Sequence, residues 1–298
     1  MRQRKLCSRK GRKRSLKFGI IMEGGASRTI FSCGVAEALM EEDIYPDVLI
    51  GVSAGIAYGV SYISGQKGRN KEFTMKYMHE PRYMGMHHLL NPKKRCYYNL
   101  AFAFDEIPNK LVPYDYEALA NYPGRVISTV TNVRTGKAEF LDIPPYETLW
   151  ETSIASCSLP VLFPPVKLGN QYYLDGGLAD PVPWKQARAM GCDKILVIRT
   201  HERNYVKKRE KGTSLINYVY KNYPEIQKLM RSRAENFNKM SDEILREEEK
   251  GNLFLITPRD TYGVKLTEGD WVKLEPLYEE GIEIGREQMP ALKRWLAS

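Results

Sequence analysis

The sequence predicts an α/β fold, a three-layer sandwich in which helices cover both faces of a largely parallel central sheet. Between about residues 16 and 200, short apolar runs alternate with segments whose apolar residues recur at helical spacing. Parallel strands need such crossover segments, which place helices on the faces of the sheet. From residue 224 onward the pattern is mostly helical, so we expect a helical C-terminal portion. In a sheet of this kind, ligands bind at the carboxyl ends of the strands.

We expect a single domain over residues 17–298, because no repeat, low-complexity linker or change of composition divides the chain. The 43% hydrophobic and 27% charged content is ordinary for a soluble protein. No apolar run approaches the roughly 20 residues that a membrane span needs. A basic start precedes an apolar stretch, but Glu23 interrupts that stretch too early for a secretory signal. A cytoplasmic location is therefore expected.

The excess of positive charge lies entirely in the first 17 residues. They contain nine lysines and arginines and no acid, so the other 36 basic residues equal the 36 acidic residues of the chain. We expect residues 1–16 to form a disordered tail. Such a tail could hold the protein peripherally at an anionic membrane surface, or attract nucleic acid without sequence specificity. A solvated tail with no partner is the alternative.

Neither the cysteines nor the histidines form a metal-binding pattern. No C-x-x-C pair and no H-E-x-x-H spacing occurs, and the odd number of cysteines does not suggest a disulfide framework. We therefore expect no metal, no cofactor and a reducing compartment. The residues concerned are Cys7, Cys33, Cys96, Cys157, Cys192, His79, His87, His88 and His201.

The first strand is expected over Leu16–Met22, followed by a turn over Glu23–Arg28 and a helix from about Ser32 to Asp43. A glycine turn at the start of a helix points backbone N–H groups at an anion. The turn lacks both G-x-G-x-x-G and the P-loop pattern, so a nucleotide site is not expected.

The segment around Ser53 has the pattern of a nucleophile elbow. The apolar run Val48–Ile50 leads into G-x-S-x-G, formed by Gly51, Ser53 and Gly55, and then into a helix of small and apolar residues. Such a turn is so tight that the residues two positions either side of the serine must lack bulk, and it presents the hydroxyl at the sheet edge. The alternative is a serine that only caps a helix in a glycine-rich turn.

Residues 66–120 are rich in methionine and aromatic side chains, interrupted by prolines. Such side chains adapt to flexible apolar ligands, so this region could form an acyl-chain groove or lid. Core beneath an irregular surface is the alternative. A hairpin over Arg125–Val133 and Ala138–Leu141 follows, then a short helix over Thr148–Cys157.

A second candidate group is Asp175, at the end of a strand over Gln171–Leu174 and directly before two glycines. By default an Asp-Gly pair is only a turn. A helix near Pro183–Met190 and a buried strand over Lys194–Ile198 come next. The remaining elements are expected over Pro224–Lys250 (helix), Leu253–Ile256 (strand) and about Asp270–Arg286 (helix).

These groups could together catalyse acyl transfer. That chemistry needs a nucleophile, a base that deprotonates it and donors for the oxyanion. Ser53 is the candidate nucleophile, and the turn after the first strand offers backbone N–H groups. The base is a histidine or a carboxylate, and Asp175 leaves the sheet where it could meet Ser53. A carboxylate can serve as the base if the exclusion of water raises its proton affinity.

The motifs, taken in order, resemble those of the patatin-like phospholipases. That family combines a glycine-rich oxyanion loop with a basic residue, a G-x-S-x-G elbow and a later Asp-Gly-Gly or Asp-Gly-Ala motif. Here these correspond to Glu23–Arg28, Gly51–Gly55 and Asp175–Gly177. Ile154–Pro160 and Phe163–Pro165 are similar to the family's approach to its aspartate. The resemblance covers about residues 17–200 well and the rest weakly.

The resemblance implies a Ser-Asp dyad without histidine, with Ser53 as nucleophile and Asp175 as general base. The substrates it implies are lipid acyl esters, which pass through an acyl-enzyme. It also implies an oxyanion hole at Gly24, Gly25 and Ala26, with Arg28 fixing the loop. The family usually has glycine where this chain has Ala26 and Thr29. If Ala26 takes a positive φ, its Cβ costs on the order of 1 kcal/mol.

Three other hypotheses remain open at this stage, and one of them, acyl transfer in preference to hydrolysis, uses the same residues. Another is an α/β-hydrolase in which His201 is the base, since Ser53, Asp175 and His201 follow that fold's chain order. Against it, only one strand precedes the elbow strand, and His201 stands in a charged stretch that predicts an exposed loop. The third is a non-catalytic lipid-binding protein with the same fold, which the substitutions Ala26 and Thr29 would favour.

Overall fold

The computed structural model describes residues 16–90, 96–144, 146, 150–209 and 217–298. The predicted tail, residues 1–16, lies outside this range except for Leu16. None of the helices in the described part of the chain is long and apolar enough to cross a bilayer.

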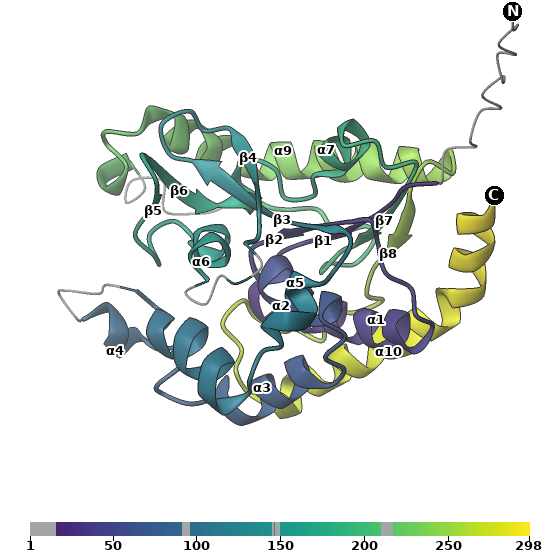
Figure 1. Cartoon of the computed structure of the whole chain (residues 1–298). Helices are drawn as coiled ribbons and strands as arrows, with labels where there is room; N and C mark the ends of the chain where they lie inside the picture. The colour runs from purple at the N-terminus through teal and green to yellow at the C-terminus, as the bar shows by residue number, and fades with distance from the viewer. Residues whose placement is uncertain (1–15, 91–95, 145, 147–149, 210–216) are drawn as a thin grey trace, which may run out of the picture.

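One eight-stranded sheet runs through the molecule, in the order β5-β6-β3-β2-β1-β7-β8, with β4 paired to β3 (Figure 1). The strands from β3 to β8 along this order are parallel, whereas β4, β5 and β6 pair in antiparallel fashion. The predicted largely parallel sheet is thus confirmed. The strands are β1 (Phe18–Met22), β2 (Val48–Val52), β3 (Arg125–Asn132), β4 (Ala138–Asp142), β5 (Val166–Leu168), β6 (Gln171–Asp175), β7 (Lys194–Ile198) and β8 (Phe254–Ile256).

Helices cover both faces of the sheet, as a three-layer sandwich requires (Figure 1). Successive residues of β1 belong to different cores, because side chains along a strand point alternately to the two faces of the sheet. Ile20 and Met22 join the core beneath α1, α2 and α10, whereas Ile21 joins the core beneath α7 and α9. The helices of these two layers are α1 (Ile30–Glu41), α2 (Ala54–Ile63), α7 (Trp184–Ala189), α9 (Pro224–Glu249) and α10 (Trp271–Ala297).

The described residues between 66 and 120 form short helices that extend the layer of α2 away from the sheet (Figure 1). One of them, η2, is a π-helix, a form that is rare and often found at functional sites. The remaining short helices are η1 (Ala26–Thr29), α3 (Arg69–Tyr77), α4 (Met86–Leu89), η2 (Phe102–Leu111), α5 (Tyr116–Ala120), α6 (Glu151–Cys157) and η3 (Gly176–Leu178).

The last helix is longer than the sequence predicts, because α10 continues past Arg286 to Ala297 and includes Pro290. Tertiary contacts stabilise the extra turns. Met289 and Leu292 are buried in the core shared with α1, and Lys293 pairs with Glu42. Strand β5, which pairs with β6 in a hairpin, also went unpredicted because it has only three residues.

Helices α1 and α10 approach each other closely at three glycines. A Cβ on Gly34 would overlap the carbonyl oxygen of Tyr278, and a Cβ on Gly281 would overlap the carbonyl oxygen of Phe31. A Cβ on Gly285 would lie 2.6 Å from the Cβ of Ala38. The C-terminal helix is therefore packed on the layer that also contains α2, backbone against backbone.

We expect Gly34→Ala to lower the free energy of unfolding by about 2 kcal/mol or more, because overpacking forces the two helices apart. The sign of this change in the free energy of unfolding is diagnostic, since alanine normally stabilises a helix interior by about 1 kcal/mol relative to glycine. Gly251→Ala is the control: its φ of 74° is strained, but no atom lies within 4 Å of the added Cβ. Urea unfolding of both variants measures the difference, and an unchanged Gly34→Ala would contradict the close packing.

Candidate active site

Ser53 stands between β2 and α2 in a strained backbone conformation, with φ 54° and ψ −131°. The two motif glycines make this turn possible. A Cβ on Gly51 would overlap Ile56, and a Cβ on Gly55 would overlap the carbonyl oxygen of Met22. A non-glycine residue at positive φ is uncommon and persists only where its surroundings impose it. The local geometry is that of a nucleophile elbow.

A serine from α6 holds the elbow in place. The backbone N–H of Ser53 donates to Ser156 Oγ at 2.8 Å, and Ser156 Oγ donates to the carbonyl oxygen of Thr129 at 2.6 Å. Ser156 is fully buried, so this bridge between elbow and β3 is shielded from water. The sequence signal was the run of small residues in α6, but it did not identify Ser156 as the bridging residue.

Asp175 reaches the same place from the opposite direction. Its strand, β6, runs antiparallel to β3 and pairs only with the last residues of β3, so that Asp175 lies opposite Val130. One residue earlier on β3, Thr129 pairs with Val52 at the end of β2. Asp175 therefore follows an antiparallel strand of the largely parallel sheet, and the short register of β6 on β3 brings it to the elbow.

The backbone around Asp175 positions its carboxylate. Its N–H donates to the carbonyl oxygen of Ser158 at 2.9 Å, and its own carbonyl oxygen accepts from Thr131 Oγ1 at 2.8 Å. Oδ1 accepts the N–H of Gly177 at 2.8 Å. The next residue must be glycine, because a Cβ on Gly176 would overlap the carbonyl oxygen of Thr129.

The electrostatics of Asp175 favour proton uptake. The residue is 2% exposed, and burial raises its pKa to about 6, against the opposing effects of the Ser53 hydroxyl, the Gly177 N–H and Arg233. Among the described residues, Oδ2 has no hydrogen bond of standard geometry. The Ser53 hydroxyl is thus near enough to influence the carboxylate without forming an ideal hydrogen bond. Cys157 lies beside both, and burial followed by the charge of Asp175 raises its pKa, which keeps it a thiol.

The glycine turn after β1 packs directly on the elbow. A Cβ on Gly24 would lie 2.6 Å from Ser53 Cβ and 2.7 Å from the carbonyl oxygen of Val52. The N–H groups of Ser27 and Arg28 donate to carbonyl oxygens. In the described part of the chain, no protein acceptor is found for the N–H groups of Gly24, Gly25 and Ala26. Ala26 has φ 48°, the strained conformation considered from the sequence.

Buried polar side chains, Glu23 after β1 with Arg199 and Thr200 after β7, support this turn. The sequence pattern did not identify them. Glu23 Oε2 accepts the N–H of Thr200 at 2.7 Å, and Thr200 Oγ1 donates to the carbonyl oxygen of Gly24 at 3.0 Å. Arg199 Nε lies 3.9 Å from Glu23 Oε2, and both side chains are almost fully buried. A glutamate at the end of an otherwise apolar strand was the available signal, because a buried carboxylate needs a partner.

His201 is half-buried, not exposed as expected, and its ring is engaged elsewhere. It stacks on Tyr205 with centroids 3.6 Å apart, and its Nε2 lies 3.1 Å from Arg28 Nη2. Burial, with the charges of Arg28, Lys207 and Arg199, lowers the pKa of His201 to about 3. The neutral ring therefore accepts the guanidinium N–H, which fixes Arg28 next to the turn.

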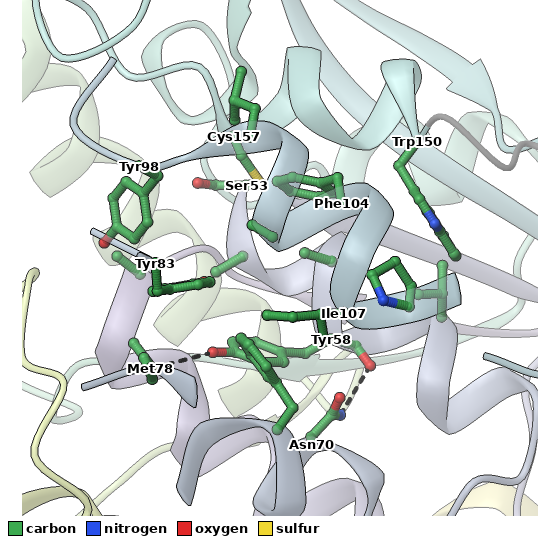
Figure 2. A pocket seen from close by; sticks show the side chains of 18 of the residues that line it. Ser53, Tyr58, Asn70, Met78, Tyr83, Tyr98, Phe104, Ile107, Trp150 and Cys157 are labelled. Atoms are coloured by element: carbon green, nitrogen blue, oxygen red, sulfur yellow. Dashed lines mark hydrogen bonds between the residues drawn. The ribbon is translucent and has the colours of Figure 1, made fainter. Parts of the chain in front are cut away.

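An apolar chamber of about 120 Å³ extends from Ser53 toward Tyr58 and Asn70 (Figure 2). Helices α2, α3 and η2 form about half of its wall. The aromatic and methionine residues of 66–120 are divided: some line this chamber, whereas Met75 and Met86 are exposed. Prominent lining side chains are Met78, Tyr83, Tyr98, Phe104, Ile107 and Trp150.

A second chamber of about 550 Å³ opens on the other side of the elbow, and its lining is more polar than that of the first chamber. It contains Asp175, the glycine turn and several charged side chains of α9 and its surroundings. Ala26, Ser53 and Leu159 line both chambers. The Ser53 hydroxyl is therefore placed at the boundary between an apolar space and a polar one.

We expect Ala26→Gly to leave the free energy of unfolding unchanged or to raise it by up to about 1 kcal/mol, because glycine relieves the positive φ. At an exposed helical position the same change costs about 1 kcal/mol, so Ala189→Gly in α7 is the matched control. Denaturant unfolding of both variants gives the comparison. Equal destabilisation of the two would show that Ala26 is unstrained.

Comparison with known proteins supplies the family. The patatin-like phospholipase family matches residues 20–188, and a domain of unknown function, DUF6363, matches residues 223–297. The uncharacterized protein YjjU of Escherichia coli is 25% identical over 62% of this chain and 52% of its own length. Lysophospholipase NTE1 of Saccharomyces cerevisiae is 23% identical over 90% of this chain. Lysophospholipase nte1 of Aspergillus niger is also 23% identical, over 98% of this chain.

The chain spans only about half the length of YjjU, and 16% and 19% of the two lysophospholipases. Among solved structures, VipD of Legionella pneumophila matches 93% of this chain and 67% of its own, with 14% identity and a TM-score of 0.45. The family match covers more than half of the chain and contains the elbow, the glycine turn and Asp175. This chain belongs to the patatin-like phospholipase family.

Proposed function

We propose that the chain is a serine hydrolase of lipid acyl esters, in which Ser53 is the nucleophile and Asp175 is the general base. The observation that carries the proposal is the position of Ser53, in a strained elbow beside a buried carboxylate and between an apolar and a polar chamber. An amphiphilic ester placed across this boundary has its acyl chain in one chamber and its polar part in the other.

In the first half-reaction, Asp175 takes the proton of the Ser53 hydroxyl as Oγ attacks the ester carbonyl carbon. The N–H groups of Gly24, Gly25 and Ala26 would donate to the resulting oxyanion. When the tetrahedral intermediate collapses, protonated Asp175 gives its proton to the departing alcohol, and the acyl group stays on Ser53. In the second half-reaction Asp175 deprotonates water, which attacks the acyl-enzyme, and the proton returns to Ser53 Oγ as the carboxylic acid leaves.

The surroundings of Asp175 suit a base that acts without histidine. A carboxylate with an ordinary pKa is too weak a base for a serine hydroxyl. A pKa of about 6 reduces the difference in proton affinity between the two groups, and most of the carboxylate is still ionised at neutral pH. His201 is poorly suited to this role because its Nε2 accepts from Arg28 and its pKa is about 3.

The apolar chamber supports substrates with a single acyl chain in the site. Its volume is the smaller of the two, and residues of η2 and α3 line it. Arg69, the charged residue among those lining it, donates to the carbonyl oxygen of Val112 at 2.8 Å and to Ser61 Oγ at 3.0 Å. A neutral alkyl chain fits this lining. The nine cations of residues 1–17 support peripheral association with an anionic membrane from the cytoplasmic side.

The dyad is tested by Ser53→Ala and Asp175→Asn, which we expect to lower ester turnover by at least about 10³-fold while the fold is retained. A fluorophosphonate probe should label the wild-type protein and leave Ser53→Ala unlabelled. Ser64→Ala is the control, because its hydroxyl donates to carbonyl oxygens at the end of α2 and Ser64 lines neither chamber. A fully active Asp175→Asn would refute the dyad, and an unlabelled wild type across lipid conditions would favour the non-catalytic lipid-binding alternative.

The raised pKa of Asp175 predicts opposite effects on activity and stability. Because the carboxylate form is the base, kcat/KM should rise with pH and level off above about 6. Above pH 6 the carboxylate of Asp175 is charged in both states. In the folded protein this charge is buried, which costs free energy, whereas in the unfolded chain, where the pKa is near 3.8, it is exposed to water. We expect Asp175→Asn to raise the free energy of unfolding by about 2–3 kcal/mol at pH 8, and by nothing below about pH 4.

The measurement is denaturant unfolding of wild type and Asp175→Asn between pH 3.5 and 8. Asp180→Asn is a control, because burial raises its pKa to about 6 as well, so its effect on stability should be similar. Only Asp175→Asn should also abolish turnover. An Asp175→Asn variant that is less stable than the wild type at pH 8 would contradict a raised pKa.

A further inference from the structure

The apolar chamber is short. Ser53 lies at one end of it, and Tyr58 and Asn70 line the other, which we call the far end (Figure 2). Tyr58 follows Ser53 by five residues along α2, a rise of about 7–8 Å. The chamber volume of about 120 Å³ is slightly less than that of a cavity, roughly 150 Å³, that accommodates a benzene molecule. The space therefore suits an acyl chain of about six carbon atoms.

A buried amide at the far end has one atom without a partner. Asn70, on α3, is 7% exposed, and its Nδ2 donates to the carbonyl oxygen of Tyr58 at 3.1 Å, which fixes the orientation of the amide (Figure 2). Oδ1 is buried and has no hydrogen-bond partner among the residues whose positions the structure describes. Cys33 lies near the amide, but no hydrogen bond of standard geometry joins its thiol to Oδ1. A strong acceptor therefore stands at the end of a largely apolar space.

Other polar side chains that line the chamber are paired within the protein. Four of them donate to protein atoms, namely Tyr58, Arg69, Tyr114 and Trp150. An acceptor that stays unpaired in a buried space costs free energy, because nothing replaces the water that it loses on burial. A ligand that brings a hydrogen-bond donor to Asn70 Oδ1 removes this cost, whereas a ligand that ends in a methyl group does not.

We propose that the apolar chamber selects a short acyl chain with a hydroxyl group at its end, and that Asn70 Oδ1 accepts the hydrogen bond of this hydroxyl. The proposal rests on the function proposed above, because it places the acyl chain of the ester in this chamber. An extended chain advances about 1.2 Å per bond, so the six bonds from the carbonyl carbon of a 6-hydroxyhexanoyl group to its hydroxyl oxygen cover about 7 Å. This length matches the separation of Ser53 and Tyr58 along α2.

The charge near the far end disfavours other polar chain ends. An ammonium group at Asn70 would lie close to the guanidinium of Arg69, the preceding residue of α3, which also lines the chamber. Two like charges repel strongly where water is excluded. A carboxylate has no proton to donate, so it would leave Oδ1 unpaired. A hydroxyl is uncharged and carries a donor, and it therefore fits both the lining and the amide.

The test compares the glycerol monoesters of 6-hydroxyhexanoate and hexanoate, which differ only in the terminal hydroxyl. We expect the wild type to prefer the hydroxylated ester, and Asn70→Leu to lower the ratio of the two kcat/KM values by about tenfold. Asn70→Ala also removes Oδ1, so it should lower the ratio as well and replaces the leucine variant if that variant does not fold. Asn204→Leu carries the same substitution at an exposed position outside both chambers, and should change the ratio less than twofold.

A binding measurement separates this proposal from the proposed hydrolase. Titrated into Ser53→Ala with and without Asn70→Leu, 6-hydroxyhexanoate should bind about tenfold more weakly to the double variant, whereas hexanoate should change less than twofold. A wild type that hydrolyses neither ester would overturn the hydrolase, and the titration would still decide the role of Asn70. Hydrolysis of both esters with a ratio and a 6-hydroxyhexanoate affinity that resist both Asn70 substitutions would overturn the selection of a hydroxyl alone. An Oδ1 paired with water gives that second result.

Discussion

The close contact of three backbone segments around Ser53 is the constraint on which the rest of the site depends. The elbow, the glycine turn after β1 and the Asp-Gly-Gly turn after β6 meet so tightly that a Cβ at Gly24, Gly55 or Gly176 would collide with a neighbouring segment. A serine at φ 54° costs on the order of 1–3 kcal/mol, and such strain persists only where the surroundings impose it. Here the parallel pairing of β1, β2 and β3 imposes it, together with the buried bridge from Ser53 through Ser156 to β3.

Stability and proposed chemistry oppose each other at Asp175. The burial that raises its pKa destabilises the folded chain at neutral pH, and a similar cost applies at Asp180 in the same chamber. The Glu23 and Arg199 pair behind the glycine turn adds two more buried charges, which seldom stabilise a protein by themselves. The large core on both faces of the sheet offsets these costs. Such a distribution is typical of a site whose groups are selected for reactivity.

The C-terminal segment packs on both helical layers around the site. Helix α10 packs against α1 through glycines, and α1 begins directly after the glycine turn. Helix α9 forms the wall of the polar chamber and packs beneath β7, whose carboxyl end carries Thr200 and His201. The segment also contacts the residues just after the glycine turn directly, because Ser27 Oγ donates to the carbonyl oxygens of Leu266 and Glu268.

The sequence alone determined most of the strands and the longer helices, the parallel centre of the sheet, the elbow and the candidate residues, because these depend on local patterns of glycine and apolar residues. It also identified Ala26 as a position of possible strain. Only the tertiary structure decided which distant groups surround Ser53: the antiparallel approach of Asp175, the support by Ser156, Glu23 and Thr200, and the pairing of His201 with Arg28. These contacts join residues more than 100 positions apart, and their formation depends on register and packing that no local pattern encodes.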